Sequence, residues 1–558
     1  MSAYIFYNGT IYTMDSAQPR AQAIGVRDGR VVAVGSEGRV HAAMRGQAEA
    51  IDLKGRAVIP ALTDAHVHLI WYALGRRNVQ LNDVADYNAA LQRVVDAAAR
   101  LPKGAWVQGN GWDHTYWGER WPRAADLDAR IPDRPVLLTR KDGHSAWVNS
   151  RALELASITD DTPDPAGGRI QREAGKATGM LFESAIDLVR HCIPELTEEE
   201  RLDAVRDAIA EAHSYGMVGM HIPPGLQPGD GALALSDLQK LRARNQLPLR
   251  CLVHLDLDYL DEAIKLGLRS GLGDRWIKLG GVKMFADGSL GSETAEMLAP
   301  YRGRGHFGIA TMPTAELNEA VSRAIDNGIS VIIHAIGDAA NRRVLNAIEA
   351  ALQQQSAVGS RQSAGGRGPT TDNLQQVTGN WQLAPALPNR IEHVQVLDSR
   401  DVPRLAQLGV IASMQPVHAT ADMDMAEQLW GARCALAYAW RTIKDTGAVL
   451  AFGSDAPVEA LNPWLGIHAA VTRQRPNGAP PDGWYAEQRL SLDEAIHGFT
   501  AGAACAAGED HRQGMLKSGM LADLAVLNVD PGKLSPADLH SVKANMTMLE
   551  GEIVWERR

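Results

Sequence analysis

His66 and His68 stand one residue apart, directly after an apolar run over residues 57–65 that is typical of a buried strand. Side chains two residues apart on a strand point to the same side of it, so both imidazoles can reach one metal ion. Alone the pair is weak, because many His-X-His tripeptides are incidental. It gains weight when other predicted strands also end in metal-ligand residues.

Four further predicted strands carry side chains that can bind a metal, namely Lys283, His334, His393 and Asp455. Each has an ordinary alternative: a histidine can be a satisfied core residue, a strand lysine can face solvent, and an aspartate can cap the next helix. Burying all of them without partners would cost several kcal/mol each, whereas a metal centre satisfies them together. We therefore predict one metal centre at which five strands converge.

The residue types also indicate the chemistry of this centre. Imidazole and carboxylate ligands suit Zn²⁺ or another divalent first-row ion, with one or two ions bound. A protonated lysine cannot ligate a cation, so we expect Lys283, as a ligand, to have reacted with CO₂ to form a carbamate, whose two oxygens could bridge two metals. A metal lowers the pKa of its bound water, and the resulting hydroxide is a nucleophile. Asp455 would be both a ligand and the general base.

Eight apolar segments separated by helical stretches predict an α/β fold, a (β/α)₈ TIM barrel. The active sites of such barrels lie at the carboxyl ends of the strands, where the candidate ligands stand. The predicted strands are 57–65, 217–221, 249–255, 279–285, 330–334, 390–394, 410–414 and 448–455.

The predicted domain organisation is discontinuous. Short strands and turns at both ends predict a composite β-sandwich domain from residues 1–56 and 510–558, with the barrel over 57–81 and 201–509. The large insertion after barrel strand one, 82–200, contains five tryptophans, which would form either a local aromatic core or a lid that lines a substrate pocket. The Gln-, Ser- and Gly-rich segment 353–385 predicts a flexible surface loop.

Composition excludes some partners. A net charge of −10 argues against nucleic acid and anionic membranes, and no apolar run is long enough to span a bilayer. The four cysteines form no Cys-X-X-Cys motif, and the chain opens without the pattern of a signal peptide. We expect a cytoplasmic enzyme that acts on a small molecule.

The chain resembles the amidohydrolase superfamily in the order of its candidate ligands, His66, His68, Lys283, His334, His393 and Asp455. More narrowly, it resembles amidohydrolase family 3, the YtcJ-like branch of that superfamily. The resemblance implies a (β/α)₈ barrel, a divalent metal centre and hydrolysis of amide C–N bonds other than peptide bonds; a homodimer is a further expectation from the family. The narrower match rests on the motifs Gly111-Trp112-Asp113, Asp142-Gly143-His144-Ser145, Lys283-Met284-Phe285-Ala286-Asp287, Ser413-Met414-Gln415-Pro416-Val417-His418 and Gly453-Ser454-Asp455-Ala456-Pro457.

The resemblance also distributes roles among the ligands. It implies that His66, His68 and Asp455 hold the first metal, that Lys283 bridges, and that His334 and His393 hold the second. The family commonly has Val-His-Asp at the end of strand two, whereas this chain has His221-Ile222-Pro223 and lacks the acidic partner.

Other candidate site residues come from their positions in the chain. Asp287 and Asp338 lie a few residues past Lys283 and His334, and we expect them to orient these ligands. The candidate substrate contacts, each on a loop expected to face the barrel mouth, are Trp112, Asp113, His144 and His418.

The leading interpretation is a metal-dependent amidohydrolase in which metal-bound hydroxide attacks an N-acyl or N-formyl amide. The same centre could serve a cyclic amide, lactone or phosphoester hydrolase. A catalytically silent metal-binding scaffold is the alternative of another class, although no residue needed to generate hydroxide is missing.

Overall fold

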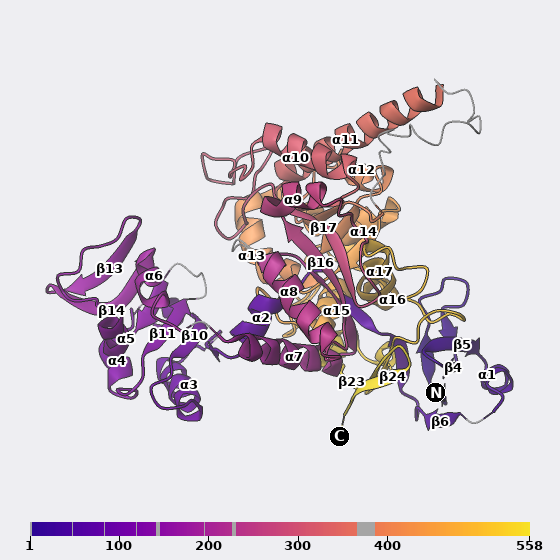
Figure 1. Ribbon diagram of the computed structural model, residues 1–558, viewed down its shortest axis with the longest axis horizontal. Helices are drawn as coiled ribbons and strands as arrows, with labels where there is room; N and C mark the ends of the chain where they lie inside the picture. The colour runs from indigo at the N-terminus through magenta and orange to yellow at the C-terminus, as the bar shows by residue number, and fades with distance from the viewer. Residues whose placement is uncertain are drawn as a thin grey trace. The chain divides into compact units, whose positions relative to one another are not determined.

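The computed structural model describes residues 3–46, 48–82, 84–118, 120–140, 145–194, 196–225, 230–364 and 386–557. The chain forms two compact units, one made of residues 1–71 and 206–558 and the other of residues 72–205. Each is described by itself below, with the element labels of Figure 1.

The larger unit contains an eight-stranded sheet in which every paired neighbour is parallel, as the sequence predicted for a (β/α)₈ barrel. The first and last strands meet where the N–H of Ala65 donates to the carbonyl of Phe452 over 3.0 Å, which brings the ends of the sheet together. In chain order the strands are β8 (Leu62–Asp64), β15 (Met217–Ile222), β16 (Arg250–Asp256), β17 (Ile277–Phe285), β18 (Val331–Ala335), β19 (Arg390–His393), β20 (Ile411–Met414) and β21 (Leu450–Phe452).

Helices alternate with these strands along the chain, and α10 and α11 pack against each other (Figure 1). The helices are α2 (Leu69–Gly75), α7 (Glu198–Ser214), α8 (Asp230–Ala243), α9 (Leu260–Lys265), α10 (Thr314–Asp326), α11 (Asp338–Ala364), α12 (Val402–Gln407), α13 (Pro416–Trp430), α14 (Trp440–Asp445), α15 (Pro463–Thr472), α16 (Leu492–His497) and α17 (Ala503–Ala506).

The predicted single strand over 57–65 is wrong in one respect, because it is two strands in two sheets. β7 (Ala57–Pro60) pairs with the carboxyl-terminal β22, and only β8 joins the barrel. The change of partner falls at Ala61, whose N–H donates to Asp523, while Leu62 donates to Gly216. Both strands are buried, so a continuous apolar run could not show the break.

Strands from the two ends of the chain form two sheets, and the six-stranded one combines strands from both ends. The two sheets share a core in which Phe6 and Ile24 near one terminus pack with Leu524 and Met548 near the other. The four-stranded sheet has the order β5 (Arg30–Gly35), β4 (Ala23–Arg27), β1 (Ala3–Tyr7) and β6 (Glu49–Asp52), and α1 (Glu37–Ala43) follows β5. The six-stranded sheet has the order β24 (Glu552–Glu556), β23 (Ala544–Leu549), β22 (Leu524–Leu527), β7, β2 (Thr10–Tyr12) and β3 (Arg20–Ala21).

The smaller unit, residues 72–205, has its own mixed sheet and its own aromatic core. The fully buried rings of Trp112 and Trp147 lie with their centroids 6.4 Å apart, and Trp117 stacks on Trp112. The tryptophans therefore build the interior of the insertion. Its strand order is β13 (Gly168–Glu173), β14 (Lys176–Glu183), β12 (Ser145–Val148), β11 (Val136–Arg140), β10 (Val107–Trp112) and β9 (Val79–Gln80), and its helices are α3 (Tyr87–Arg100), α4 (Ala124–Asp128), α5 (Ser150–Leu155) and α6 (Ala185–Arg190).

The flexible loop predicted for 353–385 is wrong over its first part, since α11 continues to Ala364. Gln and Ala have adequate helix propensity, and the preceding turns supply a formed helix to extend. Residues 365–385 lie outside the described residues. Among the helices of the described segments, none is long and apolar enough to cross a membrane.

Candidate metal centre

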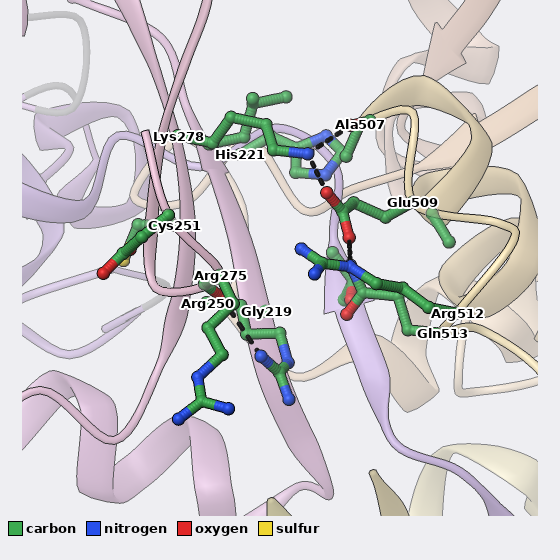
Figure 2. A pocket seen from close by; sticks show the side chains of 14 residues that line it. Gly219, His221, Arg250, Cys251, Arg275, Lys278, Ala507, Glu509, Arg512 and Gln513 are labelled. Atoms are coloured by element: carbon green, nitrogen blue, oxygen red, sulfur yellow. Dashed lines mark hydrogen bonds and ion pairs between the residues drawn. The ribbon is translucent and has the colours of Figure 1, made fainter. Parts of the chain in front are cut away.

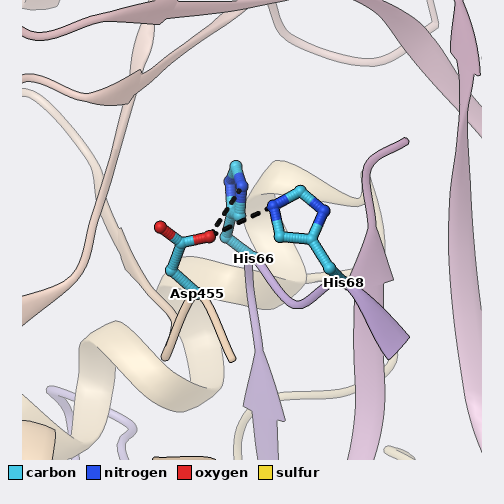
Figure 3. A group of neighbouring side chains, drawn as sticks. All are labelled: His66, His68 and Asp455. Carbon is cyan, nitrogen blue, oxygen red and sulfur yellow. Dashed lines mark ion pairs between the residues drawn. The ribbon is translucent and has the colours of Figure 1, made fainter. Parts of the chain in front are cut away.

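His66 and His68 follow β8, and Asp455 follows β21. One oxygen of this aspartate, Oδ1, lies 3.2 Å from Nε2 of His68 and 3.6 Å from Nε2 of His66. Figure 3 shows both rings directed at the same oxygen. The three side chains each offer a ligand atom within 4.8 Å of the others, close enough for one cation to contact all three.

Asp64, which we did not predict, ties the two segments that carry these ligands. Its Oδ1 accepts hydrogen bonds of 3.0 Å from the backbone N–H groups of both His66 and Ser454. The N–H of Asp455 in turn donates to the carbonyl of His66 over 2.7 Å. Burial raises the pKa of Asp64 to about 7. The signal in the sequence was an aspartate inside an otherwise apolar run.

His334 and His393, at the ends of β18 and β19, each use one ring nitrogen and leave the other available. His334 Nε2 lies 3.0 Å from the carbonyl of Gly288, which leaves Nδ1. His393 Nδ1 lies 2.8 Å from Oε1 of Gln415, which leaves Nε2. The two ring centroids are 4.6 Å apart, so the structure brings together the pair expected at the second metal position.

Lys283 is buried on β17, and its Nζ lies 4.9 Å from the centroid of the Phe285 ring. Burial lowers the pKa of Lys283 to about 8, although the carboxylates of Glu392 and Asp455 oppose this shift. A lower pKa increases the fraction of neutral amine at neutral pH.

Two of the candidate ligands have left-handed backbone conformations. The φ angle is 75° at His393 and 61° at Asp455. Residues other than glycine seldom adopt positive φ, and such strain gathers at functional sites, where the surrounding structure maintains it. Two hydrogen bonds supply that constraint at the end of β21, from the Asp455 N–H to the His66 carbonyl and from the Ser454 N–H to the side chain of Asp64.

The buried polar atoms that lack a hydrogen-bond partner at this site are suited to binding a cation. His66 Nε2 and Asp455 Oδ1 are buried and have no hydrogen-bond partner within the part of the chain that the structure describes. Leaving such atoms without partners is costly. An imidazole nitrogen and a carboxylate oxygen directed at a common point are ligands typical of Zn²⁺. The residues present therefore fit the metal that the sequence predicted.

His418 on α13, predicted as a substrate contact, lies against Asp455. Its Nε2 is 3.1 Å from Oδ2 of Asp455, and its Nδ1 is 3.6 Å from Glu459 Oε1. Burial favours the neutral ring, but the two carboxylates outweigh it and raise the pKa of His418 to about 10. His418 is thus a buried cation beside the candidate general base.

The two aspartates expected to orient ligands differ in position. Asp287 Oδ1 lies 3.6 Å from His334 Nε2, and its two oxygens accept from the N–H groups of Ile336 and Gly337 just after β18. Asp338 Oδ1 instead accepts from the N–H of Leu298 over 2.8 Å. The expected role near His334 therefore matches Asp287, whereas Asp338 holds a neighbouring loop.

The structure describes two of the three candidate substrate contacts in the insertion, Trp112 and Asp113. Trp112 is fully buried and its indole N–H donates to the carbonyl of Leu138 over 2.7 Å, so we correct its assignment to a packing role. Asp113 is buried and its Oδ1 lies 3.0 Å from a guanidinium nitrogen of Arg140. His144 lies outside the described residues.

Glu392 and Arg390 were also missed as functional residues. Glu392 Oε2 contacts His66 Nδ1, and Glu392 Oε1 lies 2.9 Å from Arg390 Nε. The signal was two charged side chains at alternate positions of a buried strand, which places both on one face. His221, which lacks an acidic neighbour in sequence, pairs through Nδ1 with Arg390 over 2.9 Å.

Comparison with known proteins shows the family of this chain. A model described as "Amidohydrolase family" matches residues 49–555. The chain is 31% identical over 99% of its length to a putative amidohydrolase, YtcJ, of Bacillus subtilis, covering 99% of that protein. It is 26% identical over 100% of its length to the N-substituted formamide deformylase of Arthrobacter pascens, covering 99% of it. A solved metal-dependent hydrolase from Pyrococcus horikoshii, itself uncharacterized, superposes with a TM-score of 0.74 at 27% identity, over 96% of this chain and 99% of that one. The chain belongs to the metal-dependent amidohydrolase family.

Proposed function

We propose that this protein hydrolyses a non-peptide C–N bond of a small N-acyl or N-formyl amide. The observation that supports this most directly is the environment of the Asp455 carboxylate. Its Oδ1 faces His66 and His68, and its Oδ2 contacts His418. These contacts support a double role for one carboxylate, as a ligand to a cation and as the group that handles a proton.

In this proposal, His66, His68 and Asp455 would hold a first divalent ion, Zn²⁺ or a related metal. His334 and His393 would hold a second through the ring nitrogens that their present partners leave available. Lys283 would bridge the two as a carbamate. Burial lowers the pKa of Lys283 to about 8, which favours the neutral amine that reacts with CO₂.

A bound metal would supply Lewis acidity, polarising the substrate carbonyl and lowering the pKa of water. The protein's own groups would manage the proton. As water adds to the carbonyl carbon, Asp455 accepts one of its protons and then delivers it to the amide nitrogen. The C–N bond breaks, and the products are a carboxylic acid and an amine. His418 holds the Oδ2 side of Asp455 during this transfer.

The choice of an N-acyl or N-formyl amide is supported by similarity along the whole chain to a protein named for removing formyl groups from N-substituted formamides. Formamides and short acyl amides are therefore the first substrates to test.

The experiment is a turnover assay of the Zn²⁺-loaded protein on N-substituted formamides, acetamides and other short amides, with cyclic amides, lactones and phosphoesters in the same panel. We expect amide hydrolysis that Asp455→Asn reduces by about 10²- to 10⁴-fold, the range for a general acid–base group. Preferential turnover of lactones or phosphoesters would contradict the choice of bond. A loaded protein that turns over nothing would favour a silent scaffold.

A further inference from the structure

The barrel interior holds a series of charged and polar side chains that contact one another beside the candidate metal centre. Glu392 and Arg390 lie two residues apart on β19, so they share a face of the strand. Both are fully buried, as is His221 on β15. Burying charged groups is costly unless each has a partner, so their contacts indicate what they do.

Glu392 stands between Arg390 and His66. Its Oε2 accepts a hydrogen bond from His66 Nδ1, and its Oε1 forms an ion pair of 2.9 Å with Arg390 Nε. The Arg390 guanidinium beside Oε1 favours the ionised form of the Glu392 carboxyl. An ionised carboxylate only accepts hydrogen bonds, so His66 Nδ1 carries the proton.

This contact determines which nitrogen of His66 is free for a ligand. With the proton on Nδ1, the lone pair is on Nε2. That atom is buried, lies 3.6 Å from Asp455 Oδ1, and has no hydrogen-bond partner among the residues described here. A carboxylate behind a metal-binding histidine fixes the ring orientation and raises its basicity.

Arg390 is itself held from three directions. One terminal nitrogen donates to the carbonyl of Ala65 and to Ser413 Oγ, each over 2.7 Å, and the other lies 2.9 Å from His221 Nδ1. Burial and the neighbouring guanidinium keep the pKa of His221 well below its ordinary value, so its ring is neutral and Nδ1 accepts. The guanidinium therefore has little freedom to leave Glu392.

His221 also lines a pocket at the amino-terminal ends of β16 and β17 (Figure 2). Three of the charged groups that line this pocket pair with one another, since Lys278 and Arg512 both contact Glu509. His221 is thus the last side chain in this series of contacts, at the opposite end from His66.

We propose that Glu392 is a positioning residue for His66, and that Arg390 and His221 hold Glu392 in place. Together these side chains set the affinity of the first metal subsite. The inference rests on the metal-dependent function proposed above. It also gives His221, which lacks the acidic neighbour common in the family, a partner and a role inside the barrel.

The test compares Glu392→Ala, Glu392→Gln and Arg390→Met with the wild-type protein. His254→Asn is the matched control, since His254 is a buried histidine on β16 whose Nδ1 accepts from the Gly281 N–H and not from Glu392, Arg390 or His221. Asn at this position retains an acceptor. Each protein is stripped of metal and titrated with Co²⁺, with affinity and the visible absorption spectrum as readouts, followed by kcat and KM.

We expect Glu392→Ala to weaken Co²⁺ binding at the tighter site by about 10- to 100-fold and to change the Co²⁺ spectrum. Glu392→Gln has the same shape, but it loses the charge that pairs with Arg390 and its amide oxygen can face only one of His66 and Arg390, so a loss of about 10-fold is expected. Arg390→Met should fall between them, and His254→Asn should retain wild-type affinity and spectrum.

Should Glu392→Ala fail to fold, the isosteric Glu392→Gln decides the matter. Wild-type Co²⁺ affinity and spectrum in the Glu392 variants that fold would overturn the inference while leaving the hydrolase function intact. Equal losses in His254→Asn would also overturn it, because they would reflect general disturbance of the barrel. A wild-type protein that binds no Co²⁺ would overturn both the metal-dependent function and this inference.

Discussion

His418 Nε2 lies 3.1 Å from Oδ2 of Asp455, while Oδ1 of the same carboxylate faces His68 at 3.2 Å. The two oxygens of Asp455 therefore have different partners, a metal-binding type of histidine on one side and a buried cation on the other. This arrangement fixes the plane of the carboxylate without blocking Oδ1.

Replacing His418 should slow turnover more than it weakens metal binding. His418→Gln removes the charged partner of Oδ2, so we expect kcat to fall by about 10- to 100-fold, with the metal content per chain unchanged. Thr420→Ala on the same helix is the control, because its hydroxyl donates to the carbonyl of Val417 within α13. Loss of metal in step with activity would show instead that His418 is a ligand.

The stability contributed by His418 should depend on pH. Its pKa is raised from an ordinary value of 6.5 to about 10, so folding favours the protonated ring. This contribution is fully present below about pH 6.5 and is lost as the pH rises through about 10. In metal-free protein, the difference in urea midpoint between the wild type and His418→Gln should be largest near pH 6 and should shrink by pH 10. A difference that grows with pH would contradict the assignment.

Metal binding should respond to bicarbonate through Lys283. If a carbamate forms, removing CO₂ should weaken binding of the second ion, and added bicarbonate should restore it. A carbamate carbon should appear in ¹³C NMR spectra after incubation with ¹³C-bicarbonate and be absent in Lys283→Met. Binding of two ions without CO₂ would contradict the bridging role.

The ion pair between Arg250 and Asp523 should contribute strongly to stability. Arg250 at the start of β16 makes two contacts with Asp523, of 2.8 and 3.0 Å, and both side chains are buried. Arg250→Met leaves a buried carboxylate without its cation, so we expect a loss of about 3–5 kcal/mol in the free energy of unfolding. Arg275→Met, which removes the half-exposed partner of Glu550, should cost about 0–1 kcal/mol. Equal costs in denaturant titrations would refute this distinction.

The aromatic core of the insertion gives a separate prediction. Trp112→Ala empties a fully buried position in the unit formed by residues 72–205 and should destabilise the protein by about 3–5 kcal/mol. Leu155→Ala, at an exposed position of the same unit, should cost much less. Thermal unfolding measures both, and a small effect of Trp112→Ala would indicate that this ring is not part of the core.

The sequence was sufficient for the barrel and for the position of the candidate ligand residues at its strand ends, because apolar runs and their terminal residues are local patterns. It could not show that the run 57–65 crosses from one sheet to another at Ala61, since both parts are buried. Nor could it show that Glu392 contacts His66 or that Asp64 accepts from the Ser454 N–H, because these partners are far apart in sequence and meet only when the barrel forms. Trp112 illustrates a further limit, since spacing does not distinguish a core tryptophan from one that faces a substrate.

The most direct test is a crystal structure of the protein grown with Zn²⁺, with diffraction data collected at the zinc absorption edge. We expect one anomalous peak from a zinc ion bound by His66, His68 and Asp455, and a second near His334 and His393. We also expect electron density for a carbamate on Lys283. No peak at these side chains under conditions that support turnover would contradict this account.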